Sequence, residues 1–440
     1  MPDRTDIYRA HGAAGLPQTP VRGAHSGLTK RGIATAKFRT RKYLVIAFIY
    51  FFINPTFFLN SPLLLTSILS PLFYLWLIRE GHKRILLNFL LVATPFIVAH
   101  LKHGIDYQSY AISFAMAITV YITVYAFYVA IPKIPSLPHL FDRIIQVNLF
   151  MSAVGVVLLL TPWYSLMWIK NTITVDVDET MRFRMLTYEP SYYSTLLVPF
   201  ALYAFWRFTS KPSSRTLLLL VAVAAPLAMS FSFGVIGGLV FTIALIYAFS
   251  FRTLWRHKLL VLAVICASAL IVRFLQDSLV WVRFMNVITG QDTSANARTI
   301  ESYFFAYQIA VEKSLWWGVG FGEVKTFDYL ITSWSGGRLI CTVADTLALF
   351  GVAGLLLRFG AEAYLFVKTR VYLNRYRLSL FIFIFIYQFT GSFTSNLAEY
   401  VVWILAFSSV FPEFDRERLP EGAGLPVAAA GVTVAHLQTT

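Results

Sequence analysis

Long apolar runs alternate with short polar segments along most of the chain. A transmembrane helix needs about twenty predominantly apolar residues, and most of the runs approach that length. We predict helical spans at 43–59, 62–78, 85–101, 108–131, 143–161, 191–207, 215–231, 233–251, 258–275, 341–367, 378–395 and 397–412. The shorter runs require helices nearly perpendicular to the membrane, or thinner membrane around them. The pattern predicts an all-α, polytopic integral membrane protein with about twelve transmembrane helices.

Lys and Arg residues are concentrated in every second connection between these runs, beginning with the segment before the first span. Because cytoplasmic loops carry an excess of Lys and Arg, both termini are expected in the cytoplasm. Residues 1–42 are predicted to form a basic, disordered tail and residues 416–440 a flexible one, on either side of a membrane domain at 43–415. The segment Ser230–Gly234 leaves an alternative open, since it fits a re-entrant tip as well as a connection between the seventh and eighth spans.

The 440 residues are 57% hydrophobic and 13% charged, more apolar than a soluble core can absorb. The net charge of +15 does not indicate nucleic-acid binding, because the charges lie in short loops between apolar runs. Two cysteines, Cys266 and Cys341, provide no disulfide framework or metal motif. The acidic run 176–179 fits a solvated turn better than a metal–diphosphate cluster. No metal and no cofactor are predicted.

Two connections on the outer side are much longer than the others, at 162–190 and 276–340. Long ordered loops in compact proteins usually carry function. The second loop contains an amphipathic pattern at 297–314, which predicts a helix that ends at the glycine-rich segment 318–322.

The end of the first long loop combines arginines with a carboxylate beside a membrane span. Pro190 suits the first turn of the following helix, because its missing N–H costs nothing there. Glu189 then lies at the positive end of that helix, where a carboxylate can accept a proton from a hydroxyl group. We predict Glu189 as a catalytic base, although an acid followed by proline is also an ordinary helix start.

Several arginines face outward, against the usual positive-inside bias. A single one is readily explained as an interfacial side chain that reaches lipid headgroups. As a set drawn from two loops, they predict a cationic pocket for a pyrophosphate. Its candidate members are Arg182, Arg184, Arg283, Arg298 and Arg338, and the candidates for lining the substrate are Tyr188, Ser191, Tyr192 and Asp345. Arg358 and Glu362 lie four residues apart within a span, a spacing that indicates a structural helix pair.

The order of these parts resembles the O-antigen polymerase/ligase superfamily over roughly residues 180–360. The resemblance is carried by YEPSYYS at 188–194, SFSFGVIGG at 230–238, NARTIESYFFAYQIAVEKSLWWGVGFGEV at 296–324 and LALFGVAGLL at 347–356. Arg298 matches the arginine that precedes the family's Gly-x-Gly-Phe-Gly segment, and Arg182 and Arg184 match its earlier-loop arginines. Ligases of the family carry a histidine just before the span matched by 341–367. Its absence here favours the polymerase branch.

The resemblance implies a glycosyltransferase in the bacterial inner membrane with a periplasmic active site. Such a polymerase transfers a growing glycan from undecaprenyl pyrophosphate onto an incoming lipid-linked repeat unit, with membrane lipids and a chain-length regulator protein as partners. A ligase that transfers finished glycan to lipid A or another acceptor is one alternative. A flippase or transporter of lipid-linked oligosaccharide is another. Sugar and linkage, and whether the product is O-antigen, capsule or exopolysaccharide, do not follow from the sequence.

Overall fold

The computed structural model describes residues 43–54, 65–171, 180–249, 285–286, 289–291, 293–327 and 339–415, which are mostly helical. The first helix is Tyr43–Ile53. The other α-helices are α2 Leu65–Arg79, α3 Ile85–Lys102, α4 Tyr107–Ala130, α5 Leu137–Leu159, α6 Pro190–Ser210, α7 Ser214–Met229, α8 Phe233–Phe249, α12 Thr293–Arg298, α13 Ile300–Lys313, α14 Thr342–Lys368, α15 Arg375–Tyr387 and α16 Leu397–Phe407. The predicted tails, the ninth span, Cys266 and the acidic run 176–179 lie outside the described residues.

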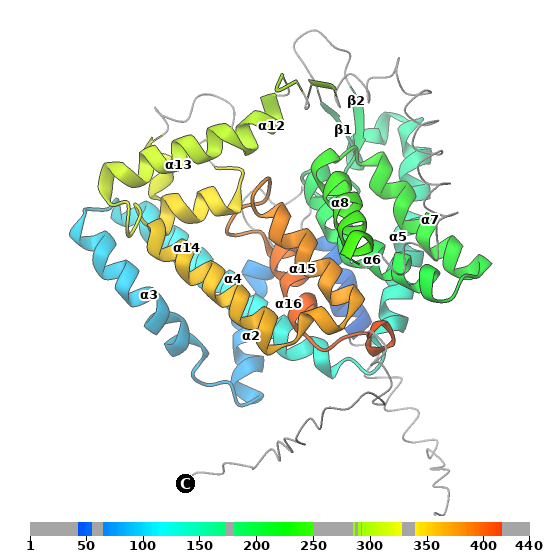
Figure 1. Cartoon of the computed structure of the whole chain (residues 1–440), viewed down its shortest axis with the longest axis horizontal. Coiled ribbons are helices and arrows are strands. Elements are labelled where there is room, and N and C mark those ends of the chain that lie inside the picture. The colour runs from blue at the N-terminus through cyan, green and yellow to red at the C-terminus, as the bar shows by residue number, and fades with distance from the viewer. Residues whose placement is uncertain are drawn as a thin grey trace, which may run out of the picture.

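The helices form two groups on either side of α15 and α16 (Figure 1). One group contains α2, α3, α4 and α14, and the other contains α5, α6, α7 and α8. Helices α12 and α13 cross one end of the molecule, where α13 packs on α14. The largest cluster of buried apolar side chains joins α5–α8 to α15 and α16. Helix α6 packs against both α15 and α16.

Four helices in the described part of the chain are long and apolar enough to cross a membrane. They are Ile85–Lys102, Tyr107–Lys133, Leu137–Leu159 and Thr342–Lys368. Further apolar helices, such as α7 and α8, are shorter than a full span. They meet at a tight turn at Ser230–Ser232, in which Phe231 has a φ of 47°. These long and short apolar helices support a helical membrane protein.

The loop predicted at 162–190 contains the strands β1, Trp168–Asn171, and β2, Thr180–Phe183, which pair antiparallel. An all-helical chain was expected, so this hairpin is a difference. Its inner face is apolar, because Trp168 and Phe183 are partners in the register and both are buried. Their rings lie 5.1 Å apart between centroids. The hairpin therefore anchors the loop to the end of the helical core.

Helix α15 ends at Tyr387, well before the end of the span expected at 378–395. The carbonyl of Gln388 instead accepts the N–H of Val343 (3.1 Å), and that of Gly391 accepts the N–H of Thr342 (3.2 Å). The chain leaves the helix here because its carbonyls satisfy the start of α14. The resulting segment, 388–396, lies inside the protein between α15 and α16.

Helix α14 is broken at Gly351, whose backbone has φ 65° and ψ −163°. A break leaves the last carbonyls of the half 342–350 and the first N–H groups of the half 352–368 without partners inside the helix. The segment after α13 supplies both sets of partners. The four N–H to carbonyl hydrogen bonds run from Val319 to Ala348 (2.9 Å), Gly320 to Leu349 (3.0 Å), Val352 to Leu315 (3.0 Å) and Ala353 to Trp316 (3.0 Å). The helix expected at 297–314 is observed as α12 and α13, separated at Thr299, and α13 ends at Lys313 before the glycine segment begins. The segment 315–320 caps both halves of α14.

Two glycines permit this close crossing of backbones. A Cβ on Gly318 would lie 2.5 Å from the backbone of Leu349, and one on Gly351 would lie 2.4 Å from the backbone of Trp316. Both glycines also have positive φ, which other residues rarely adopt. The glycines that carry the family resemblance therefore have a structural explanation at this crossing.

Candidate active site

Glu189 is the N-cap residue of α6, and Pro190 occupies the first helical turn as predicted. The Glu189 side chain forms no capping hydrogen bond to the helix. Its Oε1 instead accepts a hydrogen bond from the hydroxyl of Ser191. The side chain is 41% exposed, so the carboxylate is held near the positive helix end and remains accessible.

Arg298 is the last residue of α12 and faces Glu189 from the second long loop. Its Nη2 lies 3.7 Å from Oε1 of Glu189. The Arg298 side chain is 25% exposed, and its Nε is buried without a hydrogen-bond partner in the described part of the chain. The structure therefore brings together one predicted arginine and the predicted base from two distant segments.

Arg182 and Arg184 contact other parts of the loop region. Arg182 is buried on β2, and its Nε donates to the carbonyl of Ser230 in the turn between α7 and α8 (3.1 Å). Nη2 of Arg184 donates to the carbonyl of Ser165 (2.8 Å), and burial lowers the pKa of this guanidinium. Both hydrogen bonds brace the hairpin against neighbouring segments, whereas Arg283 and Arg338 lie outside the described residues.

Tyr188, Ser191 and Tyr192, three of the residues predicted to line the substrate, flank Glu189. The rings of Tyr188 and Tyr192 lie 5.0 Å apart between centroids. Tyr192 is 3% exposed, and its hydroxyl makes no hydrogen bond of normal geometry within the described chain. This hydroxyl lies beside the N–H of Ala398, which already donates to Asn396 Oδ1 (3.0 Å). Tyr192 thus reaches from α6 to the first turn of α16.

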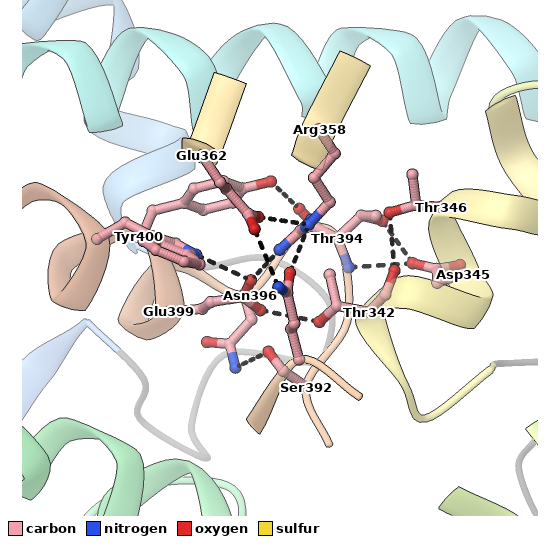
Figure 2. Close-up of polar contacts among 12 residues, drawn as sticks. Thr342, Asp345, Thr346, Arg358, Glu362, Ser392, Thr394, Asn396, Glu399 and Tyr400 are labelled. Carbon is pink, nitrogen blue, oxygen red and sulfur yellow. Dashed lines mark hydrogen bonds and ion pairs between the residues drawn. The ribbon is translucent and has the colours of Figure 1, made fainter. Parts of the chain in front are cut away.

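A buried charged network lies beside this region, on α14, α15 and α16 (Figure 2). Nε of Arg358 is 3.1 Å from Oε1 of Glu362, which confirms the predicted pair, and Nη2 forms a short ion pair with Glu399. Gln388 joins both partners, since its Oε1 accepts from Arg358 Nε (2.7 Å) and its Nε2 donates to Glu362 (3.0 Å). The hydroxyl of Thr342 donates to Glu399 Oε2 (2.8 Å). One guanidinium therefore serves two buried carboxylates.

Asp345, in the first turn of α14, belongs to the same region (Figure 2). It accepts hydrogen bonds from the N–H of Thr394 (3.0 Å) and from the hydroxyl of that residue. Tyr400 donates to the Thr394 carbonyl (2.7 Å). These contacts give Asp345 the role of holding the 388–396 segment against α14.

The Glu189–Arg298 pair and the buried network approach each other at Tyr387 and Gln388. The Thr195 hydroxyl lies one helical turn below Ser191 and donates to its carbonyl (2.9 Å). The same hydroxyl is 3.4 Å from the Tyr387 hydroxyl, and Tyr387 lies within electrostatic range of both Glu189 and Arg298. The next residue is Gln388. The two polar regions therefore meet at the end of α15.

The Glu189–Arg298 pair combines a base and an anion-binding group. A carboxylate can remove a proton from an attacking hydroxyl, and a guanidinium can hold a phosphate by charge-assisted hydrogen bonds. The described residues contain no group of three or more His, Cys, Asp or Glu residues arranged to hold a metal. The chemistry supported by these side chains is proton transfer combined with stabilisation of an anion.

No protein-family model matches the chain, and no curated protein matches it at a significant level. The resemblance described above therefore rests on motif order alone. The geometry of Glu189 and Arg298 is therefore the main observation that bears on function.

Sequence reasoning missed three residues of this region: Tyr387, Gln388 and Glu399. A signal existed for Glu399, because a carboxylate within an apolar run is a functional candidate by default. Tyr387 and Gln388 carried no such signal in a run rich in Phe and Ile. Their importance depends on where α15 ends, which the apolar pattern placed too late.

Proposed function

We propose that this protein is a bacterial inner-membrane polysaccharide polymerase. It would transfer a growing glycan from undecaprenyl pyrophosphate onto an incoming lipid-linked repeat unit. The observation that carries the proposal is the 3.7 Å approach of Arg298 to Glu189 at the N-terminus of α6. The motif order over 180–360 supports the same family.

In the proposed reaction, Glu189 accepts the proton of the acceptor hydroxyl. The acceptor oxygen attacks the anomeric carbon of the donor, and the electrons of the breaking C–O bond pass to the pyrophosphate. A pyrophosphate needs no proton to depart if its charge is stabilised, and Arg298 provides that stabilisation. A single base with no acid partner implies direct displacement, and therefore inversion at the anomeric carbon.

The ion pair also suggests how the site is prepared for the donor. Without substrate, the Arg298 guanidinium and the Glu189 carboxylate partly neutralise each other. A diphosphate offers the arginine more acceptor oxygens and more negative charge than one carboxylate. Donor binding would then draw Arg298 away and leave Glu189 free to accept a proton.

The proposed topology has twelve spans, both termini in the cytoplasm and the Glu189 site at the periplasmic face. The distribution of Lys and Arg supports this orientation. The four long apolar helices and the further short ones support insertion in a membrane. Cysteine accessibility at the 162–190 loop, measured from either side of the membrane, tests the orientation.

The decisive experiment uses purified protein in nanodiscs with a lipid-linked repeat unit as the substrate. Polymerisation should give a ladder of products on a gel. Glu189→Gln should lower the rate by roughly 10²–10⁴-fold, the usual contribution of a general base, whereas Glu301→Gln, at an exposed position of α13, should not. Undiminished ladders from Glu189→Gln would remove the base assignment.

The arginine has its own matched comparison. Arg298→Ala should reduce the rate more than Arg298→Lys, because lysine retains the charge but not the planar fork. Arg215→Ala, which removes a side chain that is 75% exposed at the start of α7, should leave the rate unchanged.

One structural observation favours a transporter as the second candidate. Discontinuous helices and buried intramembrane charges are typical of transporters, and α14 has both features. However, the broken ends of α14 are capped by backbone from 315–320, so they are not available to a substrate. A ligase is separated from a polymerase by its product, because a ligase leaves glycan length unchanged.

A further inference from the structure

An apolar cavity of about 120 Å³ lies between the first helix, the connection from α4 to α5, α6 and α16. Its size is close to that of an engineered cavity of about 150 Å³ that binds benzene. It is partly open to its surroundings. There is therefore room for one or two branched five-carbon units of a hydrocarbon chain.

The chemistry of the lining excludes a sugar or a phosphate. Aliphatic and aromatic side chains make up nearly the whole wall, including Ile144, Leu196 and Val401. The few hydroxyl groups come from Tyr43, Tyr50 and Thr195. A polar ligand would lose its hydration here without gaining hydrogen bonds, whereas a hydrocarbon gains about 0.8 kcal/mol for each buried CH₂.

The cavity lies next to the candidate active site. Thr195 lines the cavity, and its hydroxyl donates to the carbonyl of Ser191, the residue whose hydroxyl contacts Glu189. Four residues of helix separate these positions, about 6 Å along the α6 axis. Ala398, which also lines the cavity, lies beside the hydroxyl of Tyr192.

The position of the cavity along α4 indicates how long a chain must be to reach it from the Glu189 site. The lining extends to Phe127 and Ile131, at the far end of α4 from Tyr107. Twenty residues of helix from Tyr107 to Phe127 correspond to about 30 Å, close to the thickness of the hydrocarbon core. An outer-leaflet acyl chain ends near the midplane, so only a longer chain reaches from the outer site to this depth.

We propose that this cavity binds the polyprenyl chain of the donor, with the diphosphate at Arg298. The inference rests on the proposed function, and it adds the route taken by the carrier lipid. The chain descends from the start of α6 past Thr195 and Leu196 and ends among the side chains at the α4–α5 connection. Binding of the chain fixes the position of the diphosphate before the acceptor arrives.

Photocrosslinking of the full-length protein in nanodiscs tests the proposal. The probe is geranylgeranyl diphosphate with a diazirine near the end of its chain, and the parallel arm uses a phosphatidylethanolamine with a diazirine on one acyl chain. The prenyl probe should label α6 at 196–200 and α16 at 401–405, and excess unlabelled geranylgeranyl diphosphate should suppress the labelling. Even labelling of the exposed faces of α3 and α5, or stronger cavity labelling by the phospholipid probe, would overturn the proposal.

A variant pair gives an independent measurement. Ala47→Phe fills the cavity from the first helix, and Val45→Phe adds a ring on the same helix at a position that is 57% exposed and does not line the cavity. Ala47→Phe should lower prenyl labelling roughly tenfold, the equivalent of two buried CH₂ groups. Val45→Phe should leave it unchanged. Equal labelling of both variants contradicts the proposal.

The two proposals fail in different ways. If the purified protein makes no polymer from the lipid-linked repeat unit, the proposed function fails, whatever the labelling shows. If Glu189→Gln and Arg298→Ala retain full polymerisation, the roles of those two residues fail. If polymerisation depends on those residues but the cavity is neither labelled nor sensitive to Ala47→Phe, only the lipid site fails.

Discussion

Replacing Arg358 with methionine is expected to destabilise the protein strongly. The Arg358 side chain is 14% exposed and interacts with Glu362 and Glu399, which are 9% and 1% exposed. Methionine fills a similar volume but leaves both carboxylates without a counter-charge. Removing one partner of a buried ion pair typically costs about 3–5 kcal/mol, and we expect a loss of this size.

Glu399→Gln is the informative comparison, because it changes the charge and preserves the shape. The amide oxygen can still accept from Arg358, and the amide NH2 can donate to the hydroxyl oxygen of Thr342, which donates to Glu399 Oε2 in the native protein. Arg358 keeps Glu362 as its ion partner at 3.1 Å. We expect a loss of about 1 kcal/mol, the net worth of an ordinary hydrogen bond. The expected losses of stability differ strongly between the two variants because one guanidinium neutralises two carboxylates.

Thermal unfolding in detergent, followed by tryptophan fluorescence, measures both variants. At about 2 °C per kcal/mol for a chain of this size, Arg358→Met should lower the Tm by roughly 6–10 °C and Glu399→Gln by about 2 °C. The double variant Arg358→Met/Glu399→Gln should recover part of the loss, because one unpaired charge is removed. Equal losses from the two single variants, or a stable Arg358→Met protein, would refute this reasoning.

Two further predictions concern local backbone structure. Gly351→Ala should lower the Tm by several degrees, because its Cβ would lie 2.4 Å from the Trp316 backbone and its φ is positive. Gly360→Ala lies in open space on the same helix and should leave the stability unchanged or raise it by up to about 1 kcal/mol. Ser213→Ala removes the capping box of α7 and should cost about 1 kcal/mol in unfolding measurements, whereas Ser214→Ala should have little effect. A harmless Gly351→Ala, or equal effects of the two serine variants, would contradict these predictions.

The sequence predicted the starts of several elements well. Pro190 after Glu189 indicated the beginning of α6, and the amphipathic pattern expected to end at 314 matches the end of α13 at Lys313. The proline signal is local, because proline restricts the backbone at its own position. The sequence also predicted that Glu189 would lie near arginines, because the two long loops carry these charges.

Other features depended on contacts that a linear pattern does not contain. The residues around Tyr387 are apolar, yet α15 ends there because the carbonyls of Gln388 and Gly391 are taken by the start of α14. Arg182 matched the pattern of an anion-binding residue, but its Nε donates to the Ser230 carbonyl. In both cases, the observed contact is made with a partner distant in sequence.

The crossing at Gly351 means that the segment 315–320 and the helix that it caps, α14, are a single structural unit. Removing residues 315–320, or exchanging the loop with that of another protein, would expose uncapped backbone of α14 in apolar surroundings. A chimaera would therefore have to exchange the loop and the helix together. Substitutions in this region are therefore expected to be tolerated best at positions outside the crossing.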